Sequence, residues 1–151
     1  MIRIFKNTYR KLFVITLLVC GLWLIGRGSY IHTKAVLAQI LLETSWSKTL
    51  NGQKKVKPWP WADTWPVARL SAPDYGISHI VLAGASGSSL AFGPGHLFGS
   101  AEPGKDGNII ISGHRDTHFH FLKYLKVGDF LNLQSHIKTE SYNYFFHYIL
   151  V

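Results

Sequence analysis

Apolar residues in this 151-residue chain form one long uninterrupted run near the N-terminus and several short stretches further on. The long run, LFVITLLVCGLWLIG at residues 12–26, has no charged side chain and lies between Lys11 and Arg27. As a helix these residues would rise about 22 Å, less than the roughly 30 Å hydrocarbon core of a bilayer. A helix that continues to Ile31, with Arg27 reaching outward, would span that core. The pattern therefore predicts a transmembrane segment at residues 12–31.

A basic tail, residues 1–11, precedes this segment and contains Arg3, Lys6, Arg10 and Lys11. Basic flanks stay in the cytoplasm, so the residues after the segment are predicted to face outward. A cleaved signal peptide begins in a similar way. The sequence that follows the run, RGSY at residues 27–30, offers no small-x-small cleavage site. An uncleaved single-pass signal anchor is therefore the favoured interpretation.

Residues 32–65 are predicted to form a juxtamembrane helix and a linker. From residue 31 to residue 50, apolar residues recur near helical spacing, with Lys34, Gln39 and Glu43 between them. This helix is expected to pack on the following domain, although a helix that binds a partner has the same pattern. The next stretch, NGQKKVKPWPWADTWP from residue 51, contains the glycine and prolines of a linker and ends in a cluster of tryptophans.

Residues 66–151 show short β-like runs separated by turn residues. Strands are predicted at residues 67–70, 77–82, 108–112, 130–133 and 142–151. A Gly/Ser-rich loop is expected at 84–99, and one or two helical turns at 117–125. Short antiparallel strands with glycine-rich turns predict a mainly β domain, either a barrel or a sandwich.

Composition excludes several classes of protein. With 47% hydrophobic and 16% charged residues, the chain is neither disordered nor a coiled coil. Half of its formal net charge of +8 lies in the basic tail, and no later Arg/Lys stripe carries interleaved aromatic residues, which argues against nucleic-acid binding. The single cysteine, Cys20, excludes a disulfide framework. It lies inside the apolar run, away from any histidine, and is interpreted as a packing residue.

The densest group of polar residues is SGHRDTHFH at residues 112–120. His114 follows an apolar strand and a glycine, a position from which an imidazole can act as a general acid or base in a groove. A surface histidine in a turn fits the same pattern. His114, His118 and His120 could also share a metal, but no further ligand stands at suitable spacing, so neither metal nor cofactor is expected. The GASGSS segment at residues 84–89 matches neither a nucleophile elbow nor a P-loop.

Four stretches of the chain resemble the sortases, which are membrane-anchored cysteine transpeptidases. They are KAVLAQILLETSW from residue 34, PWPWADTWPVARL from 58, LAGASGSSLAFGPGHL from 82 and GNIIISGHRDTHFHFLKYLKVGDFLNL from 107. The last is the most specific, because a β-strand that runs into Gly-His-Arg-Asp is how sortases present their catalytic histidine. The tryptophan-rich stretch is similar to the Gram-negative group, called class GN or marine proteobacterial sortases. The resemblance implies that His114 is the catalytic histidine.

The resemblance also implies the fold, the location and the reaction. The domain would be a sortase β-barrel that the anchor holds on the periplasmic face of the inner membrane. A cysteine thiolate would cleave a Leu-Pro-x-Thr-Gly-like signal at the C-terminus of a secreted protein and pass the acyl group to an amine that the sequence does not identify. The histidine would protonate the leaving group, and an arginine would steady the oxyanion.

The sequence departs from the family in two places. A sortase nucleophile lies in a Thr-Leu-x-Thr-Cys-like strand well after the histidine, and its arginine lies on a later strand. Here no cysteine follows Cys20 and no arginine follows Arg115. The chain is therefore expected to be the N-terminal part of a sortase, with an incomplete barrel and no activity as given. Two alternatives remain open: a membrane-anchored peptide-binding module without chemistry, and a periplasmic metal-binding protein that uses His114, His118 and His120.

Overall fold

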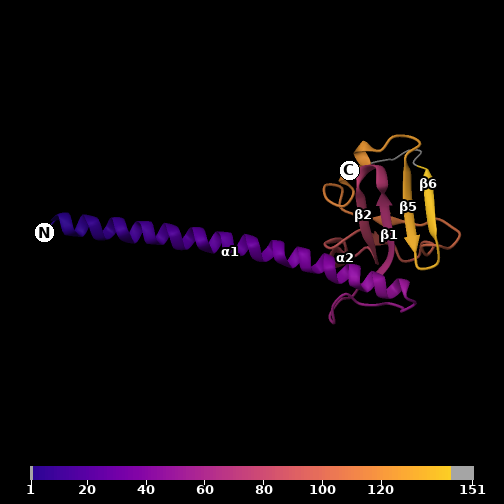
Figure 1. Ribbon diagram of the computed structural model, residues 1–151, viewed down its shortest axis with the longest axis horizontal. Helices are drawn as coiled ribbons and strands as arrows, with labels where there is room; N and C mark the ends of the chain where they lie inside the picture. The colour runs from indigo at the N-terminus through magenta and orange to yellow at the C-terminus, as the bar shows by residue number, and fades with distance from the viewer. Residues whose placement is uncertain (1, 144–151) are drawn as a thin grey trace. The chain divides into compact units, whose positions relative to one another are not determined.

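The computed structural model describes residues 2–143 of the chain. They fall into two compact units, which divide between Leu37 and Ala38. The elements of Figure 1, in chain order, are α1 (Ile2–Leu50), β1 (Pro66–Ala72), η1 (Pro73–Tyr75), β2 (Ile77–Ala83), α2 (Gly87–Leu90), β3 (Gly95–His96), β4 (Ile111–Ser112), η2 (His120–Tyr124), β5 (Phe130–Ser135) and β6 (Thr139–Asn143).

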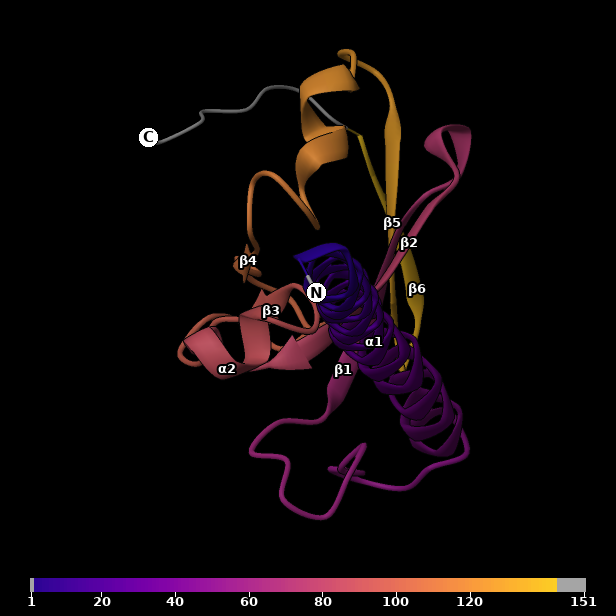
Figure 2. The same cartoon turned by 90° about the vertical axis from the view of Figure 1, so that its left-hand side faces the viewer.

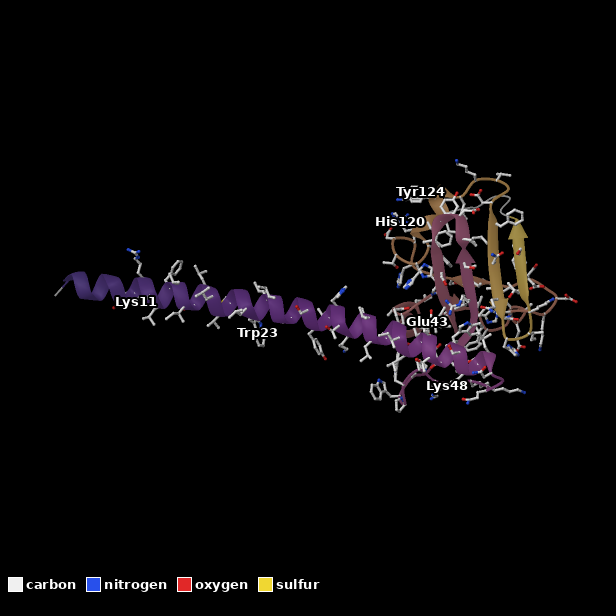
Figure 3. The ribbon with its side chains drawn as sticks, in the orientation of Figure 1. Lys11, Trp23, Glu43, Lys48, His120 and Tyr124 are labelled. Carbon is white, nitrogen blue, oxygen red and sulfur yellow. The ribbon has the colours of Figure 1, made fainter. Side chains whose placement is uncertain are left out.

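The first unit is helical and carries apolar side chains on all of its faces. Leu17, Leu18, Leu22 and Trp23 are all exposed, although helical spacing points them in different directions around α1 (Trp23 in Figure 3). A helix that is apolar all round belongs in a protein core or in a membrane. Among the described residues, α1 is the one helix long and apolar enough to cross a bilayer. The length and composition predicted for a single-pass anchor are therefore confirmed.

Helix α1 continues without a break to Leu50, so the two helices expected from the sequence are one. Gly26 and Gly28 did not end the first helix, because a glycine in a helix costs only about 1 kcal/mol relative to alanine. Within the second unit this helix has one buried stripe at spacings of three and four residues. Its members are Ala38, Leu42, Ser45, Trp46 and Thr49.

The second unit is built on a six-stranded mixed sheet with the order β4-β3-β2-β1-β5-β6. Residues of β1 are alternately buried and half-buried, as expected for a strand that covers a core. Its Ala68 pairs with Val81 of β2 on one side and with Ser135 of β5 on the other. The mainly β prediction is confirmed. The antiparallel expectation is wrong for one pair, since β2 and β3 run parallel.

Both faces of β2 are covered. Ile80 and Leu82 pack with Leu42 and Trp46 of α1. Val81, which points to the opposite face, packs with Phe121 of η2 in a second cluster that also holds Ala68, Leu70, Ala72, Leu125 and Leu133.

An ion pair fastens the helix to the sheet on the first of these faces. The guanidinium of Arg69 on β1 binds both carboxylate oxygens of Glu43 on α1 (Glu43 in Figure 3) and donates to Ser78 Oγ at 3.0 Å. A two-bond contact of this kind orients the two elements as well as attracting them.

Three strand predictions, at 67–70, 77–82 and 130–133, are confirmed with slightly longer bounds, and η2 lies inside the predicted helical turns. Two expectations are wrong. The segment 84–99 holds α2 and β3 besides loop, and the strand expected at 108–112 is reduced to Ile111–Ser112. Of the strand expected at 142–151, residues 142 and 143 lie at the end of β6, and the remainder lies outside the described residues.

Candidate active site

His114 lies just beyond β4, in a tight turn. Ser112 at the end of β4 pairs with Gly95 of β3, so the histidine begins the segment that leaves the sheet. Its carbonyl oxygen accepts hydrogen bonds from the backbone N–H of Thr117 at 3.3 Å and of Phe119 at 3.1 Å. From there the chain continues into η2 (Figure 2). The turn is therefore closed by the backbone of His114, which leaves the exposed imidazole outside the hydrogen-bonded ring.

Phe119 anchors this turn to the core. A Cβ atom on Gly113 would lie 3.0 Å from the Phe119 ring, so glycine allows the ring to approach the end of β4 closely. Phe119 also packs against the cluster around Val81, and its ring centroid lies 6.3 Å from that of Phe121. Residues on both sides of His114 are thus held by packing, although its own side chain is not.

Two further histidines, His79 and His118, lie together on the face of the sheet that carries Val81. His79 of β2 pairs in register with Leu70. Its ring centroid is 5.7 Å from that of His118 and 6.3 Å from that of Phe121. Burial lowers the pKa of His79 below its usual value, although a backbone hydrogen bond with His118 opposes this effect. Burial also lowers the pKa of His118, and the charges of His79 and His114 act in the same direction.

The other polar side chains of the motif make separate contacts. Arg115 Nε and Asp116 Oδ1 form an ion pair of 3.3 Å, with both side chains largely exposed. Lys123 Nζ donates to His120 Nε2 at 2.7 Å, and His120 packs edge-on against Tyr124. Figure 3 shows His120 and Tyr124 side by side at one end of the sheet. His120 is thus engaged on η2, while the electrostatic neighbours of His118 are His79 and His114.

The proposed metal set is not brought together. Among the side chains described, those of residues 9–142, no group of three or more His, Cys, Asp or Glu is placed to hold a metal ion. The serines of residues 84–89 are occupied locally: Ser86 Oγ caps α2, and Ser88 Oγ donates to Asp63 Oδ2 at 3.0 Å. Cys20, the only cysteine of the chain, is exposed on the first unit.

His79 is the residue of this site that sequence reasoning missed. Alternation along β2 places it on the same face as Val81, which is a usable signal. Its approach to His118 is a contact between residues far apart in the sequence, and no local pattern shows such a contact.

Comparison with known proteins identifies the family. The sequence profile described as the sortase domain matches residues 70–150, more than half of the chain. The chain belongs to the sortase family. A search of curated proteins finds no match.

Two solved sortases share its fold. The Clostridium perfringens sortase D5 transpeptidase is 22% identical, with a TM-score of 0.55 over 72% of this chain and 71% of that one. Sortase A from Corynebacterium diphtheriae is 21% identical, with a TM-score of 0.50 over 72% and 61%. Sortase C-1 from Actinomyces oris is 33% identical, with a TM-score of 0.47 over 52% and 48%. The chain therefore spans about half the length of the Actinomyces enzyme.

Proposed function

We propose that this chain is the N-terminal part of a membrane-anchored cysteine transpeptidase in which His114 is the catalytic histidine. The observation that carries the proposal is the placement of His114 in a sortase-family domain. It follows the end of β4, its backbone closes a packed turn, and its imidazole is exposed. An imidazole in this position can transfer a proton to a substrate bound along the strand.

In the proposed reaction a thiolate attacks a peptide carbonyl, a C–S bond forms and the C–N bond breaks. His114 gives its proton to the departing amine. An incoming amine then displaces the thiolate from the thioester and gives its proton back to the histidine. The charge of His114 helps to lower the pKa of His118, and a His118 that resists protonation adds little positive charge beside a protonated His114, which supports the proposed role.

By family likeness, the proposed substrate is a secreted protein with a Leu-Pro-x-Thr-Gly-like sorting signal at its C-terminus. The tryptophan-rich stretch at residues 58–70 supports the assignment to the Gram-negative group. Trp59 of this stretch packs edge-on against Phe92, with ring centroids 4.9 Å apart. The proposal assigns the thiol and the arginine to strands encoded after residue 151. The 151 residues themselves hold no cysteine other than Cys20 and no arginine after Arg115.

Sequencing the DNA beyond codon 151 tests this assignment. A Thr-Leu-x-Thr-Cys-like segment followed by an arginine is expected in the same frame or in a shifted one, within about a hundred codons, the scale of one domain's remainder. Residues 1–151 alone are expected to show no thiol-dependent cleavage of sorting-signal peptides, because His114 has no thiol to activate. If no frame encodes such a cysteine, the transpeptidase proposal is wrong.

The proposal also places the body of the chain in the periplasm. The four basic residues ahead of Leu12 favour a cytoplasmic N-terminus. Alkaline phosphatase fused after Val151 should therefore be active in cells, whereas a reporter that works only in the cytoplasm should stay silent. The reverse pattern would overturn this topology without affecting the role of His114.

A second candidate is a membrane-anchored module that binds peptides without cleaving them. The observation in its favour is that Cys20 is the only thiol in the sequence. Adding the Cys-bearing strands of a related sortase separates the two functions. Cleavage that appears with these strands supports the transpeptidase, and peptide binding without cleavage in both forms supports the module.

A further inference from the structure

A cavity of about 490 Å³ opens at the end of the sheet where β1 begins and β2 ends. Its walls come from the residues after α1, the start of β1, the loop after β3 and the turn between β5 and β6. No residue of the 112–121 segment lines it. The volume lies in the range of about 300–1,000 Å³ that small-molecule sites occupy.

Positive charge predominates around this cavity. Lys54, Lys55 and Lys105 line it, against the single carboxylate of Glu102. Lys105 Nζ pairs with Glu102 Oε2 at 2.7 Å, and this contact lowers the pKa of Glu102, as do the nearby His96 and His136 to a smaller degree. Among the side chains that the structure describes, those of residues 9–142, neither Lys54 nor Lys55 forms an ion pair. Two lysines are therefore in excess over the carboxylate.

An aromatic ring, that of Phe98, also lines the cavity. Phe98 is 67% exposed although it is a large apolar side chain. A Cβ atom on Gly84, whose φ is +80°, would lie 2.9 Å from Phe98 Cε2, so the ring rests directly on the glycine backbone. Trp65 and Ile137 add apolar surface, and Lys55 Nζ lies 5.2 Å from the centre of the Trp65 ring. A ring held open to solvent in this way is a surface on which another flat ring can stack.

We propose that this cavity binds a small soluble anion that carries a flat ring. A phosphate or carboxylate group lies against Lys54 and Lys55, and the ring lies against Phe98. Both the lysines and the Phe98 ring are needed for binding, because exposed lysines alone attract an anion only weakly in water. The proposal does not depend on the transpeptidase function.

Titration calorimetry on the full chain in nanodiscs of neutral phosphatidylcholine tests the proposal. The probes are phenyl phosphate, benzoate, inorganic phosphate and the uncharged ring compound benzyl alcohol. Lys54→Gln/Lys55→Gln removes the two excess charges, and Phe98→Ala removes the ring. The matched control is Lys48→Gln/Lys57→Gln, which removes two exposed lysines from the same part of the chain, neither of which lines the cavity (Lys48 in Figure 3).

Phenyl phosphate or benzoate is expected to bind saturably and at least about tenfold more tightly than inorganic phosphate or benzyl alcohol. The cavity double variant should weaken binding by about tenfold or more, Phe98→Ala by about threefold or more, and the control should leave it unchanged. Equal loss in the control and the cavity variant, equal binding of benzyl alcohol, or no saturable binding at millimolar probe would each overturn the proposal. So would loss of probe binding in discs that contain phosphatidylserine, which would assign these lysines to a lipid surface.

Discussion

His96 in β3 and His114 just after β4 have opposite environments, and the difference shows two uses of one residue type. His96 on β3 is only 5% exposed, and its Nε2 lies 2.8 Å from the carbonyl oxygen of Ala101 and 3.0 Å from Ser100 Oγ. His114 lies beyond the other end of β4 and is exposed, and within the described part of the chain only its backbone forms hydrogen bonds. A buried ring whose nitrogen is held by the backbone fixes structure, whereas an exposed ring on a fixed backbone is available for proton transfer.

Exchanging these two histidines for alanine should separate the two uses, and the largest effect is expected at His114. In an enzyme with the Cys-bearing strands restored, His114→Ala should reduce peptide cleavage to background, a loss of at least about 10²–10⁴-fold, because proton transfer is lost. His118→Ala and His120→Ala are the matched controls and should keep most of the turnover. Near-normal turnover by the His114 variant, measured by release of a fluorescent peptide, would contradict its proposed role.

For His96 the expected effect of the substitution is on stability. His96→Ala should lower the free energy of unfolding of the full chain by about 2–3 kcal/mol, because it leaves a cavity and removes a partner from the Ala101 carbonyl. His136→Ala, which changes an exposed histidine, should alter it by less than about 0.5 kcal/mol. Urea unfolding in micelles measures both. Equal stability of the two variants would show that the buried hydrogen bonds of His96 are not structural.

A smaller effect, on the pH dependence of stability, is expected for His79 and His118. Their pKa values are lowered in the folded chain, so the unfolded chain binds more protons as the solution is acidified. The stability that they contribute is present above the unfolded histidine pKa of about 6.5 and is lost as the pH falls below it. The double variant His79→Gln/His118→Gln should therefore show a smaller drop in melting temperature between about pH 7.5 and 5 than the parent chain. An identical drop in both proteins would contradict this account.

The sequence predicted the parts of the fold that have a repeating local pattern. Strand β1 alternates between buried and half-buried residues, strand β2 ends in a short apolar run, and the anchor helix has an unbroken apolar run. Strand β3 was missed because two residues, Gly95 and His96, are too few to show a period. The helix of the second unit was expected, but its continuity with the anchor was not, because the apolar run gives way near Ile31 to an amphipathic pattern that was interpreted as a separate helix.

The candidate site was predicted only in part. His114 was found because its neighbours Gly113, Arg115 and Asp116 form a recognisable motif. The proximity of His79 and the engagement of His120 by Lys123 depend on how β2 and η2 pack, which the linear pattern does not contain.

The position of β1 in the sheet has a consequence for the order in which this chain can fold while it is being made. Strand β1 finds β2 almost at once, since the two are joined by η1 and one glycine. Its other edge waits for β5, which is synthesised about 60 residues later, or roughly 3–12 s at about 5–20 residues per second. During that interval an unpaired strand edge is open to other chains. The hairpin of β1 and β2 is therefore exposed to association with other chains until β5 has been synthesised.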